Sequence, residues 1–374
     1  MRQGLKEAKR IVVKVGSSTL TYETGRLNLS RIEALVRQIV NLLNQGKEVV
    51  LVSSGAVAAG LPALGFSEKP KDLRKKLAAA SVGQGVLLHI YEKFFREYGV
   101  TVGQLLLTRE DTVLRSHYMN LRNTLLELLD LGVVPIINEN DVVAIEEFKI
   151  GDNDTLSAMV ASAIEADVLL ILSDIDGLYT ANPSQDPTAT LISTVEALTP
   201  EVMGLAGDAG SSLGTGGMVT KLSAARIATS SGTTMVIAKG EEDHIIERVV
   251  AGEEVGTLFV ANQELRHVKQ RWFAFGRRLK GKLFVDKGAR DALLTHHKSL
   301  LPVGLVRVEG EFQEGDTVSV YYENEEIARG LTSFSSVDAI KLVGVRTERI
   351  PDVLGINTAY DEIIHKDNLV LLAK

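Results

Sequence analysis

Short apolar segments that alternate with helix-length segments constrain the fold of this chain more than any other feature. The apolar segments cover residues 11–15, 48–52, 101–107, 133–137 and 167–172. Helical patterns lie between or after them, at 30–44, at 71–98, up to about 131, and at 156–164. Nearly continuous apolar strands that alternate with helices predict an α/β fold, a mostly parallel sheet sandwiched by helices.

The helix at 30–44 shows the pattern most clearly. Its apolar residues recur at helical spacing, which predicts an amphipathic helix. Ser30 is the predicted N-cap and Gly46 the predicted stop.

Four of the predicted strands end in small or polar residues. These ends are Gly16-Ser17-Ser18, Ser53-Ser54-Gly55, 138–141 and 173–177. In an open parallel sheet, ligands bind outside the carboxyl ends of the strands. The four ends therefore predict one ligand site.

Lys14 lies near the end of the first strand, just before Gly16-Ser17-Ser18. A lysine on an apolar strand costs desolvation free energy unless an anion pairs with it. A turn of small residues lets that anion approach backbone N–H groups. This pattern predicts a phosphate site. The alternative is an edge-strand lysine that points to water.

A glycine-rich segment, 210–221, opens a predicted helix and ends in Lys221. Free N–H groups and the helix dipole favour phosphate at such a position. The alternative is a flexible surface loop. The chain has neither the P-loop pattern nor a G-x-G-x-x-G between a strand and a helix, so a nucleotide would be bound by another arrangement.

Asp152, Asn153 and Asp154 precede the predicted helix 156–164. Asp and Asn are common N-caps, but one cap does not need three such residues. At least one of them is therefore expected in the site.

The polar residues collected at these positions suit phosphoryl transfer. They are two lysines, loop N–H donors, a carboxylate able to hold lysines, and the amides of Asn138 and Asn153, with no Ser-His or Cys-His arrangement among them. Phosphoryl transfer asks for positioning and charge stabilisation, not a protein nucleophile. A carboxylate acceptor would need no general base, because it is already ionised at neutral pH. The pair His296-His297 is interpreted as solvated surface.

Six segments together resemble the glutamate 5-kinase family, which has the amino acid kinase fold. They are Lys14-Val-Gly-Ser-Ser, Val52-Ser-Ser-Gly-Ala-Val-Ala-Ala-Gly60, Ile137-Asn-Glu-Asn-Asp141, Gly151-Asp-Asn-Asp154, Ser173-Asp-Ile-Asp-Gly-Leu-Tyr179 and Gly214-Thr-Gly-Gly-Met-Val-Thr-Lys221.

The resemblance implies transfer of the ATP γ-phosphate to the side-chain carboxylate of glutamate, the first step of proline synthesis. Lys14 and Lys221 would contact the transferred group, and Asp154 would orient them. Glutamate would be held by Ser54, Asp141 and Asn153, with help from Asn138 and Asp152. ATP would be bound by Lys14, Ser173, Asp174 and the segment Thr215, Gly216, Gly217, Met218, Val219, Thr220 and Lys221.

The resemblance also implies Mg²⁺ with the nucleotide. The sequence shows no dedicated set of carboxylate ligands for this ion, so no metal ligands are assigned. Feedback inhibition by proline and a homodimer or homotetramer are further expectations. The alternative acceptors are aspartate, acetylglutamate and a nucleoside monophosphate.

Composition limits the class of protein. The 374 residues predict two domains, the net charge of -7 argues against nucleic acid as the main partner, and the absence of cysteine excludes disulfides and thiolate sites. No apolar run is long enough to cross a membrane, and the charged start leads straight into a strand, so a cytoplasmic location is expected.

The predicted domains are a kinase domain at 1–262, a basic linker at 263–280 and a β-rich domain at 281–374. The β-rich part resembles the PUA domain, which is known from RNA-modifying enzymes. An RNA-binding protein is therefore the alternative from another class. From Gly276 to Lys374 the chain has 14 Lys and Arg against 15 Asp and Glu residues, which disfavours a phosphate-binding surface.

Overall fold

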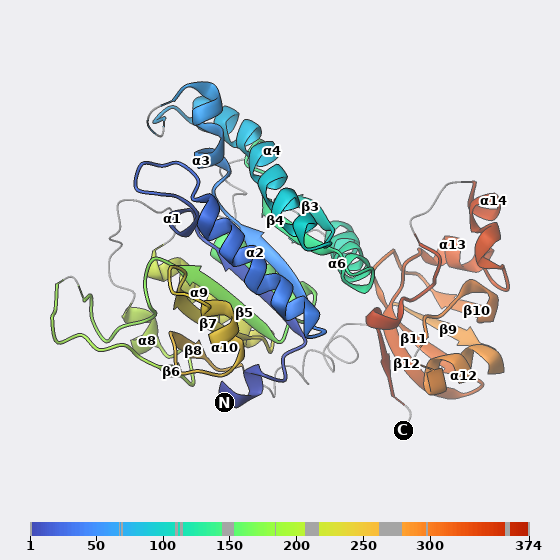
Figure 1. The fold of residues 1–374 in the computed structure, drawn as a ribbon. Coiled ribbons are helices and arrows are strands. Elements are labelled where there is room, and N and C mark those ends of the chain that lie inside the picture. Colours follow the sequence, from blue (N-terminus) through green and yellow to red (C-terminus); the bar gives the residue numbers. More distant parts are fainter. Residues whose placement is uncertain are drawn as a thin grey trace. The chain divides into compact units, whose positions relative to one another are not determined.

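The computed structural model describes residues 2–66, 68, 70–108, 111–112, 115–143, 153–183, 185–205, 217–261, 279–296, 298–355 and 360–372. The chain divides into two compact units, Met1–Leu265 and Arg266–Lys374 (Figure 1). Each unit has a sheet and a hydrophobic core of its own.

The first unit is built on one eight-stranded sheet. Its strands are β1 (Arg10–Val15), β2 (Glu48–Ser53), β3 (Val102–Leu107), β4 (Val134–Glu139), β5 (Val168–Ser173), β6 (Thr194–Val195), β7 (Thr234–Lys239) and β8 (Thr257–Phe259). They lie in the order β3-β4-β2-β1-β5-β7-β8-β6. Neighbours pair in parallel except β7 and β8, which are antiparallel. The predicted mostly parallel sheet is thus confirmed.

Helices cover both faces of this sheet. They are α1 (Ser17–Leu20), α2 (Leu29–Asn44), α3 (Ala56–Gly60), α4 (Leu73–Glu97), α6 (Arg115–Asp130), α7 (Asn153–Ala163), α8 (Pro200–Gly204), α9 (Met218–Ser230) and α10 (Ile245–Val250), with 3-10 helices at Arg2–Leu5 and Pro62–Leu64.

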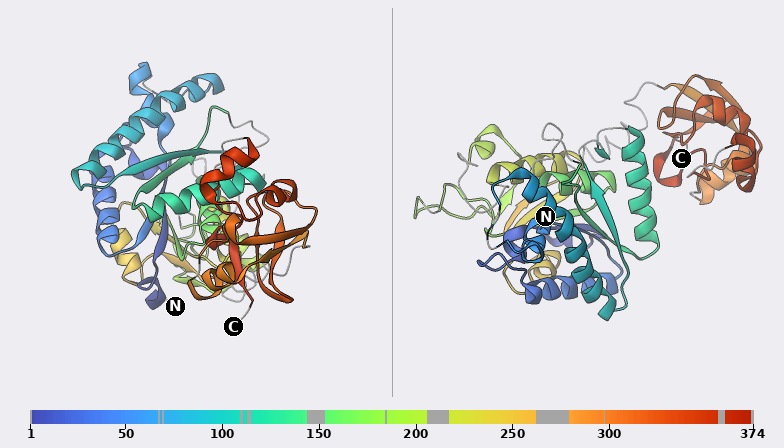
Figure 2. Two further views of the ribbon diagram at one scale, coloured as in Figure 1. Left: turned by 90° about the vertical axis from the view of Figure 1, so that its right-hand side faces the viewer. Right: turned by 90° about the horizontal axis from the view of Figure 1, so that it is seen from above.

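The two faces of β1 enter two different cores. Ile11, Val13 and Val15 pack with α2, α4 and α10, whereas Val12 packs with α6, α7 and α9. This division follows from the two-residue period of a strand. Figures 1 and 2 show the sheet lying between the two helical layers.

The strand order brings the four predicted ends together. Because β4, β2, β1 and β5 are consecutive and parallel, their carboxyl ends lie along one edge of the sheet. The chain first builds the sheet from β1 toward β2 and β4, and then returns to the other side of β1 with β5. Such a reversal beside β1 is where open α/β sheets bind their ligands.

One local prediction was wrong: Asn28, not Ser30, caps α2. The Asn28 side chain accepts a hydrogen bond from the backbone N–H of Arg31 at 3.2 Å, and the helix begins at Leu29. Ser30 is therefore inside the first turn. Gly46 follows the helix with φ +76°, a conformation that suits glycine and ends the helix as predicted.

Helices α3 and α4 approach each other so closely that only glycine fits at two positions. A Cβ on Gly60 would lie 2.0 Å from the Ala79 carbonyl oxygen, and one on Gly83 would lie 1.7 Å from that of Ala56. Gly55, with φ +101°, makes the turn from β2 into α3. The residues after β2 are therefore tightly fixed against α4.

The second unit is β-rich, as predicted, and has the five-stranded sheet order β10-β9-β11-β12-β13. Figure 2 shows this unit in orange and red. Its strands are β9 (Gly281–Val285), β10 (Leu305–Gly310), β11 (Thr317–Tyr322), β12 (Glu325–Leu331) and β13 (Leu369–Leu371). Its helices are α12 (Lys287–His296), α13 (Ser336–Lys341) and α14 (Ile350–Leu354), with 3-10 helices at Pro302–Gly304, Thr347–Arg349 and Lys366–Asn368.

Two sequence predictions in this unit have only partial counterparts. The basic linker at 263–280 lies outside the described residues except for Leu279 and Lys280. His296 is exposed, as predicted, and His297 is outside the described residues. In the described part of the chain, none of the helices is both long enough and apolar enough for a membrane span.

We predict that Gly83→Ala destabilises the protein by about 3 kcal/mol, because the new methyl group forces two helix backbones apart. Gly85→Ala on the same helix is the matched control, since a Cβ there has nothing within 4 Å. That control should stabilise by about 0.5–1 kcal/mol through helix propensity. Urea unfolding measures both, and equal effects of the two substitutions would contradict the close contact.

Candidate active site

Lys14, Asp154 and Lys221 come from three elements that meet at the carboxyl edge of the sheet. Lys14 follows Val12 by two residues, so it points to the face covered by α7 and α9. Asp154 lies in the first turn of α7, and Lys221 lies in the first turns of α9. The structure therefore brings together the three residues that the sequence predicts to be catalytic.

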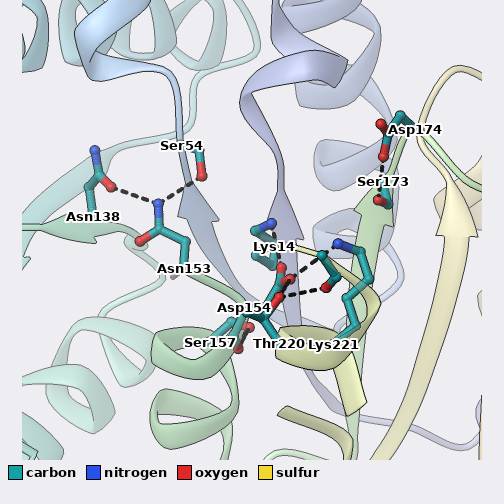
Figure 3. Close-up of polar contacts among 11 residues, drawn as sticks. Lys14, Ser54, Asn138, Asn153, Asp154, Ser157, Ser173, Asp174, Thr220 and Lys221 are labelled. Carbon is teal, nitrogen blue, oxygen red and sulfur yellow. Dashed lines mark hydrogen bonds and ion pairs between the residues drawn. The ribbon is translucent and has the colours of Figure 1, made fainter. Parts of the chain in front are cut away.

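The Asp154 carboxylate joins the two lysines (Figure 3). Lys14 Nζ lies 2.5 Å from Asp154 Oδ1, and Lys221 Nζ lies 3.3 Å from Oδ2. Thr220 Oγ1 also donates to Oδ2, at 3.1 Å. The Asp154 side chain is fully buried, and each lysine side chain is only 6% exposed.

The packing of α7 on α9 explains how these residues meet. Small residues that are completely buried line both helices: Ala158 and Ala161 on α7, and Ala224, Ala225 and Ala228 on α9. Small side chains let the helices lie close together, so their N-terminal ends meet. A carboxylate in the first turn of α7 also interacts favourably with that helix dipole.

Burial of the three charged groups of Lys14, Lys221 and Asp154 costs desolvation free energy. Two ammonium groups and one carboxylate sum to one net positive charge, and charges inside a protein need close partners. Such a cluster favours a nearby anion.

The Lys14 ammonium group faces the turn that follows β1. A Cβ on Gly16 would lie 3.7 Å from Lys14 Nζ and equally far from Ser18 Oγ. Among the described residues, Asp154 is the one ion-pair partner of Lys14, so other N–H donors of its ammonium group remain for a ligand. A phosphate oxygen at Gly16 would meet both this ammonium group and the turn.

A second polar cluster lies on the β2 and β4 side of Lys14 (Figure 3). Asn153 Nδ2 donates to Ser54 Oγ at 2.7 Å and to Asn138 Oδ1 at 3.0 Å. Asn138 Oδ1 also accepts from the Glu139 backbone N–H, at 2.9 Å. These bonds link the ends of β2 and β4 to the start of α7.

The hydrogen bonds within this cluster leave both donors and an acceptor for a ligand. Ser54 Oγ accepts from Asn153, so its own proton can be donated. The Asn138 side chain also has two amide N–H donors, and its oxygen already accepts two hydrogen bonds. Asn153 Oδ1 is a buried acceptor with no partner among the described residues.

The residues that the sequence predicts to bind the nucleotide lie on the other side of Lys14, at the end of β5 and the start of α9. Ser173 Oγ donates to Asp174 Oδ1 at 2.9 Å. Gly217 is the N-cap of α9 and brings no side chain to the N–H groups of the first turn, which contains Met218, Val219 and Thr220. These N–H groups are donors of the kind that phosphate needs.

The remaining predicted site residues are placed as follows. Asp141 lies half-buried in the turn after β4. Asp152, Thr215 and Gly216 fall outside the described residues.

Sequence reasoning missed Thr257, which fixes the loop after β5. Thr257 Oγ1 accepts from the Leu178 backbone N–H at 2.8 Å and donates to the Ile192 carbonyl at 2.6 Å. A Cβ on Gly177 would lie 2.3 Å from this oxygen. Thr257 is far from the loop in sequence, so no local pattern could have identified it.

The described residues include no group of three or more His, Asp or Glu side chains that could hold a metal ion. The Asp154 carboxylate, the most buried acid of the site, is engaged by both lysines. The donor set thus fits a Mg²⁺ ion that takes its ligands mainly from phosphate and water.

Comparisons with known proteins agree with this arrangement. The amino acid kinase family model matches residues 9–239, and the PUA domain model matches residues 281–354. Glutamate 5-kinase of Moorella thermoacetica is 50% identical over 372 residues, which cover 99% of this chain and 98% of that protein. Glutamate 5-kinase of Caldanaerobacter subterraneus subsp. tengcongensis is 52% identical over 366 residues, or 98% of each chain.

Among solved structures, UMP kinase from Bacillus anthracis aligns with a TM-score of 0.48 and 17% identity, covering 68% of this chain and 97% of that chain.

We predict that Asp154→Asn lowers the free energy of unfolding by about 3 kcal/mol, because two buried ammonium groups then lose their shared carboxylate. Asp186→Asn is the control, since this half-buried carboxylate accepts local hydrogen bonds from Thr188 and contacts neither lysine. Its effect should stay within about 0.5 kcal/mol. A loss below about 1 kcal/mol in the Asp154 variant, measured by urea unfolding, would show that the carboxylate does not balance the lysines.

Proposed function

This chain belongs to the amino acid kinase family, and within it to the glutamate 5-kinases, and we propose from this premise that it phosphorylates L-glutamate. The γ-phosphate of ATP is transferred to the side-chain carboxylate. The product is γ-glutamyl phosphate, and the reaction is the first step of proline biosynthesis. The family and the PUA domain expected from the sequence are both confirmed.

The observation that carries the proposal is the position of the charged cluster between two polar groups. Ser54, Asn138 and Asn153 lie toward β2 and β4, whereas Ser173 and Asp174 lie at the end of β5. The strand order β4-β2-β1-β5 puts Lys14 of β1 between them (Figure 3). An acceptor on one side and a nucleotide on the other would meet at the lysines.

The chemistry needs no general base. A glutamate side chain has a pKa of about 4.3 and is ionised at neutral pH. One carboxylate oxygen forms a bond to the γ-phosphorus, the bond from that phosphorus to the β–γ bridging oxygen breaks, and ADP leaves with the electron pair. The protein has to bring two anions together and stabilise the negative charge of the transition state.

The lysines meet this requirement in our proposal. Lys14 and Lys221 contact the transferred phosphoryl group, which reduces its repulsion of the incoming carboxylate. Asp154 orients both ammonium groups from α7. It also provides the negative charge that keeps two lysines buried side by side.

Ser54, Asn138 and Asn153 form the cluster that we propose binds the phosphoryl acceptor, named the acceptor cluster below. Its groups suit a zwitterionic amino acid. The Ser54 hydroxyl and the Asn138 amide group donate, which suits a carboxylate. Asn153 Oδ1, which no described residue contacts by a hydrogen bond, can accept one, which suits an ammonium group. Asp141 and Asp152 are proposed as further glutamate-binding residues on the strength of the family motifs alone.

The nucleotide is bound from the β5 and α9 side in this proposal. Ser173 and Asp174 follow β5, and the segment Thr215 to Lys221 leads into α9. Mg²⁺ bound with ATP would supply charge neutralisation at the phosphates. Because no metal cage exists among the described residues, its ligands would be phosphate oxygens and water.

We also propose three properties that the family resemblance implies. They are a cytoplasmic location, inhibition by proline, and a homodimer or homotetramer. RNA binding by the PUA domain is not part of the proposal, since its segment of the chain has no excess of positive charge.

We predict that the purified protein turns over ATP and Mg²⁺ with free glutamate, but not with aspartate, acetylglutamate or UMP. Lys221→Ala should lower kcat about 100-fold or more, because a transition-state contact is lost. Lys75→Ala, which removes an exposed lysine, is the control and should leave kcat unchanged. Turnover of another acceptor would retain the lysines' role but contradict the acceptor assignment.

We further predict that Ser54→Ala raises the KM for glutamate about 10-fold, because the acceptor loses one hydrogen-bond donor to a charged group. The KM for ATP, measured in the same assays, should change less than twofold. Equal changes in both KM values would place Ser54 outside the acceptor site.

A further inference from the structure

Tyr91 lies beneath the acceptor cluster, on the opposite face of the sheet from Lys14. It is on α4, is completely buried, and its hydroxyl lies 2.9 Å from Ser53 Oγ. Burial raises the pKa of Tyr91 above its ordinary value. The hydroxyl therefore stays neutral and keeps its proton.

The direction of this hydrogen bond follows from the number of protons. Ser53 Oγ donates its single proton to the Ser54 carbonyl oxygen, at 3.0 Å. Tyr91 must then be the donor to Ser53. A continuous chain runs from the Tyr91 hydroxyl through Ser53 to the peptide group of Ser54, whose own hydroxyl is held by Asn153 on the other side.

The same helix holds the neighbouring parts of the acceptor cluster. Gly83 contacts the backbone of Ala56, two residues after Ser54. Gln84 Nε2 donates to the Glu139 carbonyl at 3.3 Å, next to Asn138. Gly83 and Gln84 precede Tyr91 by eight and seven positions, which is about two turns of an α-helix. The three residues therefore lie on one side of α4.

We propose that Tyr91 is a positioning residue for the acceptor: through Ser53 it fixes the place of the Ser54 hydroxyl and thereby the binding of the glutamate carboxylate. Tyr91 does not touch the substrate. This inference rests on the proposed function, because Ser54 has a role in catalysis only if it binds the acceptor.

Tyr91→Phe tests the inference, since it removes the hydroxyl and keeps the ring that fills the core. The KM for glutamate should rise about fivefold, the effect of one lost hydrogen bond, whereas the KM for ATP should change less than twofold. Tyr98→Phe is the matched control: it removes the hydroxyl of an exposed tyrosine at the C-cap of the same helix, which donates to Glu33, away from the site. It should change neither KM.

Two further variants, Ser53→Ala alone and combined with Tyr91→Phe, test whether the effect of Tyr91 is transmitted through Ser53. If Tyr91 acts through Ser53, Ser53→Ala alone should raise the KM for glutamate to a similar extent, and the double variant should be no worse than the stronger single variant. Multiplied effects in the double variant would contradict transmission through Ser53. Ser53→Ala also keeps the question open to measurement if Tyr91→Phe fails to fold.

The outcomes separate the two proposals. Wild-type protein that does not turn over glutamate would contradict the proposed function. Wild-type turnover with an unchanged glutamate KM in Tyr91→Phe, or with equal changes in both KM values, would contradict only the role of Tyr91.

Discussion

The two ion pairs of Asp154 are the interaction on which the rest of the site depends. One buried carboxylate contacts lysines from β1 and α9, and it does so from the first turn of α7. Without this carboxylate, two ammonium groups would be buried side by side at a high energetic cost. With it, the fold keeps two cations close together at the carboxyl edge of the sheet, where the proposed reaction would bring a carboxylate and a polyphosphate together.

The sheet order turns this cluster into a divided site. Because β1 lies between β2 and β5, residues that follow β2 and β4 lie on one side of Lys14 and residues that follow β5 lie on the other. The first side offers both donors and a buried acceptor, as an amino acid requires. The second side offers hydroxyl, carboxylate and helix N–H groups. The separation suits two substrates that react directly with each other.

Helix α4 supports the proposed acceptor side of the site from behind the sheet. Gly83 allows backbone contact with the start of α3, and Tyr91 donates to Ser53 at the end of β2. Rigid support of this kind suits phosphoryl transfer, where catalysis depends mainly on positioning.

Much of the fold could be predicted from the sequence because its signals are local. Apolar strands, helical spacing and small residues at strand ends predicted the sheet and the edge where the site lies. The cap of α2 was misassigned because Asn28 and Ser30 are both good capping residues, and only backbone geometry distinguishes them. The Tyr91–Ser53 and Thr257–Leu178 contacts were not predictable, since each joins residues 38 or 79 positions apart with no shared motif.

The central claim is that the side-chain carboxylate of glutamate attacks the γ-phosphate of ATP directly. The most direct measurement uses glutamate labelled with ¹⁸O in that carboxylate, followed by mass spectrometry of the inorganic phosphate released when the acyl phosphate cyclises. The account predicts one ¹⁸O atom in each phosphate, because the bridging oxygen comes from the acceptor and leaves with phosphorus. Unlabelled phosphate would mean that water is the acceptor, and this would contradict the account.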